Sequence, residues 1–176
     1  MVGGLAVGVR SEPRFTRDVD LAVAVHSDVE AEQIVHALLS RGYRLKFLLE
    51  QKGVKRLGTA RLITPYHDQL FLDLLFASCG MEPEIVATAE LVTVVKGLRV
   101  KVAQRGHLIA MKLLSTSKDR PQDKIDLHEL AKSATPPDWE HASHAVLLME
   151  RHGFARGRKL SARLSALQRS SLRKRS

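Results

Sequence analysis

Two aspartates at alternate positions of an apolar run, Asp18 and Asp20 in the segment DVDLAV, constrain the fold of this chain more than any other feature. Because side chains alternate between the two faces of a β-strand, both carboxylates are expected on one face of a strand over residues 18–25. Two like charges this close are tolerated best around a cation, and Mg²⁺ takes carboxylate oxygens together with phosphates. The segment therefore predicts a metal-dependent phosphate site.

A third carboxylate, Asp73, lies in a second apolar run, residues 70–76. An unpaired buried carboxylate costs several kcal/mol, so Asp73 needs a partner or a metal. If the two strands are neighbours in one sheet, Asp18, Asp20 and Asp73 are expected to converge on one or two Mg²⁺ ions. Asp73 is then also a candidate general base toward an acceptor hydroxyl.

Two alternatives stay open for these carboxylates. Asp18 and Asp20 can form a polar strand edge, and their partners are then Arg14 and Arg17. Asp73 can be a structural carboxylate that accepts hydrogen bonds from the backbone.

The rest of the chain predicts an α/β (α+β) fold in which helices flank a mixed sheet and a helical region follows. The segment Ser27-Asp28-Val29-Glu30 has the capping-box pattern, and Gly42 is expected in the left-handed conformation after the helix. We expect a catalytic core over residues 1–104 and a C-terminal helical region over residues 105–176. The predicted helices cover residues 3–10, 28–39, 83–89, 105–117, 121–134, 138–153 and a tail from 160, and the predicted strands cover 18–25, 43–49, 59–66, 69–77, 91–95 and 98–102. The buried side of the helix over 121–134 is predicted to hold Ile125, Leu127, Leu130 and Ala131.

The formal net charge of +9 is confined to the C-terminal end. Nine of the 28 Lys and Arg residues lie in residues 151–176, which contain no Asp or Glu, so the rest of the chain has 19 basic and 19 acidic residues. This block predicts contact with a polyanion, nucleic acid rather than membrane; the alternative is a solvated tail without a partner. The candidate contacts are Arg156, Arg158, Lys159 and Arg163.

Other features point to the cytoplasm. Cys79 is the single cysteine, which excludes an internal disulfide. No apolar run approaches the roughly 20 residues needed to cross a bilayer, and the first ten residues do not have the pattern of a signal peptide.

The spacing of Gly3-Gly4, thirteen residues, and then Asp18-Val19-Asp20-Leu21 resembles the signature of the DNA polymerase β-like nucleotidyltransferase superfamily. The fuller pattern of GGLAV, TRDVDLAV, LIAMKLL and RPQDKIDL, from Gly3 to about Leu130, is similar to the AbiEii-type toxin nucleotidyltransferases. The resemblance implies a nucleoside triphosphate (NTP) substrate, Mg²⁺, and a toxin role in type IV-like toxin–antitoxin or phage-defence systems. Some members of the family transfer nucleotides to tRNA.

The resemblance also implies residues that bind the nucleotide. The backbone N–H groups of the Gly3-Gly4 turn, at a helix N-terminus, are expected to face the phosphates. Lys112 and Asp123 match later Lys and Asp motif positions, and Lys112 is the candidate contact for the triphosphate. An ion pair of Lys112 with Asp123 or Asp126 is the alternative. Arg17 either contacts phosphate or only balances the carboxylates.

Two departures from the superfamily pattern concern the turn. A helix and a strand usually precede it, whereas Met1 nearly abuts Gly3 here. Either the given start is late or the first sheet element is missing, and a missing element is expected to loosen the phosphate loop. The superfamily often has Gly-Ser in place of Gly3-Gly4, which removes a hydroxyl contact and leaves the backbone donors.

The favoured function is transfer of a nucleoside monophosphate from an NTP to an acceptor hydroxyl, with RNA, especially a tRNA end, favoured by the basic block. A second hypothesis is transfer to a small molecule or a protein side chain. A third is a non-catalytic module on a decayed fold that binds nucleic acid or an antitoxin.

Overall fold

A four-stranded mixed sheet carries the residues singled out above. The computed structural model describes residues 1–173. The strands of this sheet are β1 (Asp18–Ala22), β2 (Arg44–Gln51), β3 (Arg56–Thr64) and β4 (His67–Leu75). Their order is β1-β4-β3-β2, with β1 parallel to β4 and the other neighbours antiparallel. The two strands that carry aspartates are therefore adjacent, as predicted.

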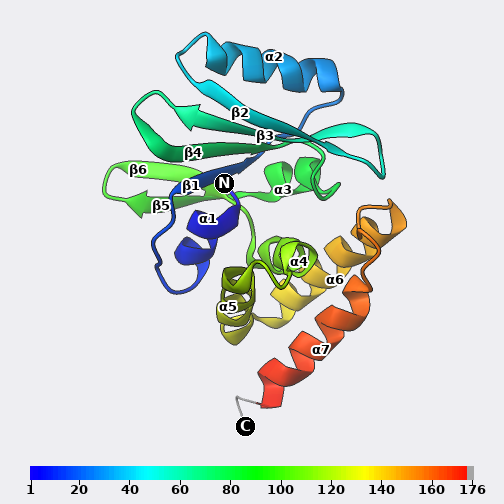
Figure 1. Cartoon of the computed structure of the whole chain (residues 1–176). Coiled ribbons are helices and arrows are strands. Elements are labelled where there is room, and N and C mark those ends of the chain that lie inside the picture. The colour runs from blue at the N-terminus through cyan, green and yellow to red at the C-terminus, as the bar shows by residue number, and fades with distance from the viewer. Residues whose placement is uncertain (174–176) are drawn as a thin grey trace.

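The remaining elements surround this sheet (Figure 1). A separate hairpin is formed by β5 (Glu90–Val95) and β6 (Leu98–Val102). The helices are α1 (Gly3–Arg10), α2 (Asp28–Leu39), α3 (Glu82–Thr88), α4 (Arg105–Ser115), α5 (Pro121–Lys132), α6 (Pro136–Arg151) and α7 (Leu160–Arg173). The fold is thus the mixed α/β arrangement expected from the sequence.

Helix α2 covers one face of the sheet, and the other helices lie on the opposite side (Figure 1). Ala31 and Val35 of α2 belong to a buried cluster with apolar residues of β3 and β4. The start of α2 is fixed by the Ser27 side chain, which accepts a hydrogen bond from Glu30 N–H at 3.2 Å. The Glu30 carboxylate accepts a hydrogen bond from His26 N–H rather than from Ser27 N–H. Only half of the predicted capping box therefore forms.

A second and larger core surrounds α4, which packs against α1, α5, α6 and α7. Leu108, Ile109 and Leu113 of α4 are almost fully buried. Because this core also includes Val2, Ala6 and Val7, it joins the start of the chain to the C-terminal helices. The division between residues 104 and 105 stays a prediction.

Most predicted elements are confirmed with shifted ends, and three further details differ. Strand β1 ends at Ala22 rather than Val25. Ile125 is 54% exposed, because the buried stripe of α5 follows positions 123, 126, 127, 130 and 131 and leaves position 125 outside it. The start of the chain is tied down rather than loose: Val2 N–H donates to Asp20 O at 2.8 Å, and the Met1 amino group donates to Lys101 O at 2.7 Å. Within residues 1–173, no helix is long and apolar enough to cross a membrane.

Candidate active site

The register of the sheet brings the three predicted carboxylates together. Asp20 of β1 lies opposite Asp73 of β4, and Asp18 lies opposite Phe71. Asp18 and Asp20 share a face of β1, since they are two residues apart. On its other side Asp73 lies opposite Arg61 of β3. One row across the sheet therefore contains Asp20, Asp73 and Arg61.

Asp20 sits against the Gly3-Gly4 turn. Gly3 has a φ of +68°, and a Cβ atom added to it would lie 1.9 Å from Asp20 Oδ2. Burial, together with the charges of Asp73 and Asp18, raises the pKa of Asp20 to about 6, although the charge of Lys112 and a backbone hydrogen bond from Gly4 act in the opposite direction. The turn thus packs directly against the carboxylate of Asp20, and the backbone N–H of Gly4 donates a hydrogen bond to it.

Arg61 connects the carboxylates in a way that the sequence did not predict. Its Nε donates to Asp73 Oδ1 at 2.7 Å, and its second guanidinium nitrogen donates to Asp73 Oδ2 at 2.5 Å and to Asp18 Oδ2 at 3.3 Å. These bonds to Asp73 raise the pKa of Arg61, which is charged at any physiological pH. The partner that the buried Asp73 needs is therefore Arg61, not the backbone.

Lys112 forms the ion pairs that were its alternative interpretation. Its Nζ lies 2.6 Å from Asp123 Oδ1 and 2.7 Å from Asp126 Oδ2. The Asp126 side chain is 1% exposed; its Oδ2 accepts a hydrogen bond from Arg14 at 2.8 Å, and its Oδ1 forms an ion pair with Arg14 Nε at 2.7 Å. Burial alone would raise the pKa of Asp126, but the hydrogen bonds from Arg14, Lys112 and Gln122 lower it. Arg14 thus pairs with Asp126 and not with the carboxylates of β1.

Arg17 meets the site through its backbone. Its carbonyl accepts a hydrogen bond from Phe71 N–H at 3.2 Å, which extends the pairing of β1 with β4. Its side chain is exposed. The predicted contact of Arg17 with phosphate stays a prediction.

The basic block at the C-terminal end is folded, not a free tail, over the residues that the structure describes. Arg163 donates to Leu113 O at 2.9 Å and Arg158 donates to Leu114 O, so both cap the last turn of α4, where carbonyls lack helical partners. Arg156 donates to Ser78 O at 3.0 Å, and Lys159 is exposed. Residues 174–176, which hold two more basic side chains, lie outside the described part.

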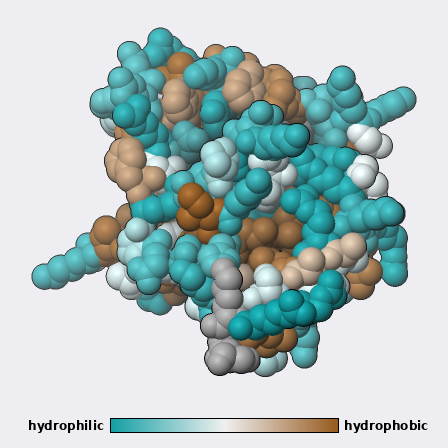
Figure 2. All heavy atoms as spheres, turned by 60° about the horizontal axis from the view of Figure 1, so that its bottom comes forward, coloured by the Kyte–Doolittle hydropathy of each residue, from teal (hydrophilic) through white to brown (hydrophobic). Residues whose placement is uncertain are grey.

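The face formed by the C-terminal helices is mixed in character. Figure 2 brings it forward and shows hydrophilic side chains over much of it, with apolar side chains between them. Leu172 of α7 and Ile125 of α5 are among the exposed apolar residues of the chain. Binding of nucleic acid by the four predicted tail residues stays a prediction.

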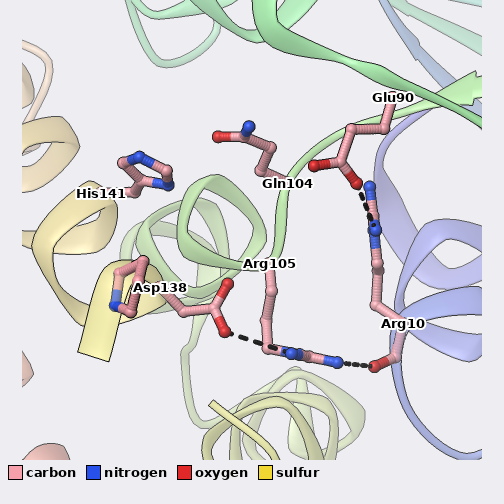
Figure 3. A pocket seen from close by; sticks show the side chains of 7 residues that line it. Arg10, Glu90, Gln104, Arg105, Asp138 and His141 are labelled. Atoms are coloured by element: carbon pink, nitrogen blue, oxygen red, sulfur yellow. Dashed lines mark hydrogen bonds and ion pairs between the residues drawn. The ribbon is translucent and has the colours of Figure 1, made fainter. Parts of the chain in front are cut away.

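A pocket of about 180 Å³ lies away from the three carboxylates, between α1, β5, α4 and α6 (Figure 3). Its charged groups already have partners: Arg10 pairs with Glu90 at 2.7 Å, and Arg105 pairs with Asp138 at 3.1 Å. Arg105 also donates to the carbonyl of Arg10 at 2.7 Å. These bonds tie α1 to the hairpin and the helical region, so we assign the pocket a structural role.

The donor set fits Mg²⁺, which is commonly held by one or two carboxylates together with substrate phosphates. The carboxylates of Asp18, Asp20 and Asp73 supply hard oxygen atoms on one side of the sheet. Among residues 1–173, no group of three or more His, Cys, Asp or Glu side chains is arranged so that it could hold a metal ion by itself. In this structure Arg61 engages both oxygens of Asp73.

Two contributors to the site differ from what the sequence suggested. Arg61 was not predicted, and Arg14 was considered only as a partner of Asp18 and Asp20. The turn after Thr64 gave no signal for Arg61, because the register shifts between Ile63 and Thr64 before Arg61 comes to lie opposite Asp73. The pairing of Arg14 with Asp126 spans 112 positions, and no local pattern reveals it.

Comparison with known proteins places the chain in a family. The model of the family described as "Nucleotidyl transferase AbiEii toxin, Type IV TA system" matches residues 1–175. No curated protein matches the chain.

Proposed function

The chain belongs to the AbiEii family of nucleotidyl transferase toxins of type IV toxin–antitoxin systems, and we propose that it transfers a nucleoside monophosphate from an NTP to a hydroxyl of RNA, with Mg²⁺. Family membership implies an NTP substrate and an antitoxin partner. The observation that carries the proposal is the alignment of Asp20 with Asp73 across adjacent parallel strands, with Asp18 two residues away.

In this reaction each side chain of the site has a distinct chemical role. Asp18, Asp20 and Asp73 would hold Mg²⁺, which when bound neutralises phosphate charge and polarises the phosphoryl oxygens. Asp73 accepts the proton of the acceptor hydroxyl as that oxygen bonds to the α-phosphorus. The bond from the α-phosphorus to the bridging oxygen breaks, and pyrophosphate leaves with that electron pair. Lys112, near Asp20, interacts with the triphosphate.

RNA is the proposed acceptor because of the surplus positive charge. All of the formal excess of +9 falls in residues 151–176. Lys159, Arg169 and Arg173 are exposed there and remain available to phosphates, while Arg158 and Arg163 cap α4. A tRNA end and a cytoplasmic location stay predictions.

The proposal is tested by incubating the purified protein with each NTP labelled at its α-phosphate, Mg²⁺ and total RNA. We expect the label to enter RNA with the wild-type protein and to fall about 100-fold or more with Asp73→Asn. The matched control is Asp68→Asn, on the same strand β4, because Asp68 is exposed and pairs only with Arg44 at the hairpin end.

The location of the label separates the acceptors. Label removed by ribonuclease supports RNA, while label that stays with a protein band or a small molecule contradicts it. No transfer from any NTP, with a folded protein and intact RNA, would refute the enzymatic proposal. Equal transfer by Asp73→Asn and wild type would refute the assigned site.

A further inference from the structure

The position of Arg61 suggests a role beyond pairing with one carboxylate. Its guanidinium makes two bonds to Asp73 and reaches Asp18 at 3.3 Å, so one fixed positive charge bridges two of the three proposed metal ligands. The Asp73 side chain is 10% exposed and that of Arg61 is 24% exposed, so water screens the pair only in part. Bidentate pairs of this kind are strong and directional.

Aromatic rings from two strands hold the guanidinium in this place. The ring centroid of Phe71 on β4 lies 5.3 Å from Arg61 Cζ, and that of Phe47 on β2 lies 5.5 Å away. Arginine stacks favourably on aromatic faces, so these rings restrict where the side chain can go. The row across the sheet is therefore Phe47, Arg61, Asp73 and Asp20, from β2 to β1.

The bridge competes with a metal ion for the same oxygens. Both Asp73 oxygens and one Asp18 oxygen accept from Arg61, and a divalent ion needs lone pairs of the same carboxylates. The fixed positive charge also repels a cation that approaches between them. An NTP brings phosphate oxygens, which supply further ligands to the ion and a negatively charged partner for the guanidinium.

We propose that Arg61 is a positioning residue that acts as an internal counter-cation: it occupies the space between Asp18 and Asp73, so that the centre binds a divalent metal weakly alone and strongly only together with an NTP. This inference rests on the proposed function of the same site. It gives the site an order of assembly, in which the metal and the nucleotide arrive together.

The test is a titration with Mn²⁺ in the absence of nucleotide, followed by calorimetry or by the electron paramagnetic resonance signal of free Mn²⁺. We expect Arg61→Gln to bind Mn²⁺ at least about tenfold more tightly than wild type, because a charge adjacent to the ligands is removed. Arg61→Lys keeps the charge and is expected to bind like wild type. A second Asp20→Asn substitution in the Arg61→Gln background should abolish the gain, which assigns it to this site.

Matched controls separate this role from a purely structural one. Arg56→Gln removes an arginine from the same strand, where it pairs with Asp28 at 2.6 Å outside the site, and should leave Mn²⁺ binding unchanged. If Arg61→Gln fails to fold, Phe47→Leu provides the second variant, because loss of one ring frees the guanidinium and should tighten Mn²⁺ binding by a smaller factor.

The results that overturn the inference are equal Mn²⁺ dissociation constants for wild type and Arg61→Gln, or no binding by either protein. Addition of an NTP should tighten Mn²⁺ binding by wild type far more than by Arg61→Gln, and an equal gain in both proteins also overturns it. Because the first titration contains no nucleotide, these failures are distinguishable from a failure of label transfer by wild type, which refutes the proposed function itself.

Discussion

The contact between Gly3 and Asp20 allows a prediction that isolates one steric clash. Gly3 has a φ of +68°, and its absent Cβ would lie 1.9 Å from Asp20 Oδ2. Ordinary contact begins near 3.4 Å, so in Gly3→Ala the Asp20 carboxylate must retreat by about 1.5 Å, the difference between these distances. A shift of about 1 Å in a catalytic group can reduce the rate about 100-fold, and we expect a loss of that size in label transfer.

Gly97 provides the matched control. It has a φ of +84°, in the hairpin between β5 and β6, and a Cβ added there meets nothing within 4 Å. Each alanine substitution carries the backbone cost of the left-handed conformation, about 1–2 kcal/mol. Gly97→Ala should therefore lose about 2–8 °C in Tm for a chain of this size, and Gly3→Ala at least as much, while only Gly3→Ala loses activity. If Gly3→Ala retains activity equal to that of Gly97→Ala, the close contact between the turn and Asp20 is not functional.

Three further predictions concern Asp126 and the C-terminal basic residues. Asp126→Ala should lower the free energy of unfolding by about 3 kcal/mol in urea titrations, because it leaves Arg14 without its buried partner and Lys112 with Asp123 alone. The pKa of Asp126 is lowered in the folded protein, so its stabilising contribution is present above about pH 4 and is lost as the pH falls through the lower value. Between pH 7 and pH 3, Asp126→Asn should therefore lose less stability than wild type, and parallel pH profiles would contradict the pairing. Arg163→Gln should destabilise the protein by about 1 kcal/mol with little effect on RNA binding, whereas Lys159→Gln should weaken RNA binding and leave Tm unchanged.

The local patterns of the sequence were enough to place the strands and the carboxylates. Alternation put Asp18 and Asp20 on one face, and the lone carboxylate of an apolar strand identified Asp73 as a residue in need of a partner. The adjacency of β1 and β4 followed only from the hypothesis that all three carboxylates serve one site. It is confirmed by the parallel register of Asp20 with Asp73.

The partners across long sequence distances were not predictable in the same way. The position of Arg14 beside Asp126 depends on how α1, α4 and α5 pack, and periodicity within one helix contains no such information. The role of the C-terminal arginines also depends on packing, because net charge alone does not distinguish a guanidinium that caps α4 from one that faces solvent. The exposed position of Ile125 was also not predictable from its residue type, since an apolar residue in a helix need not face the core.

The charges around the site explain why the arginine and lysine pairs do not make a metal ion redundant. The charged side chains of the site on the sheet are the acids Asp18, Asp20 and Asp73 and the base Arg61. Three acids against one base leave a formal charge of −2 when all are ionised, which is the charge that one divalent cation offsets. The raised pKa of Asp20 has the same origin, since burial and two neighbouring carboxylates act on it together. Lys112 is expected to stay paired with Asp123 and Asp126 and to interact with the phosphates through its remaining N–H donor, together with a bound cation.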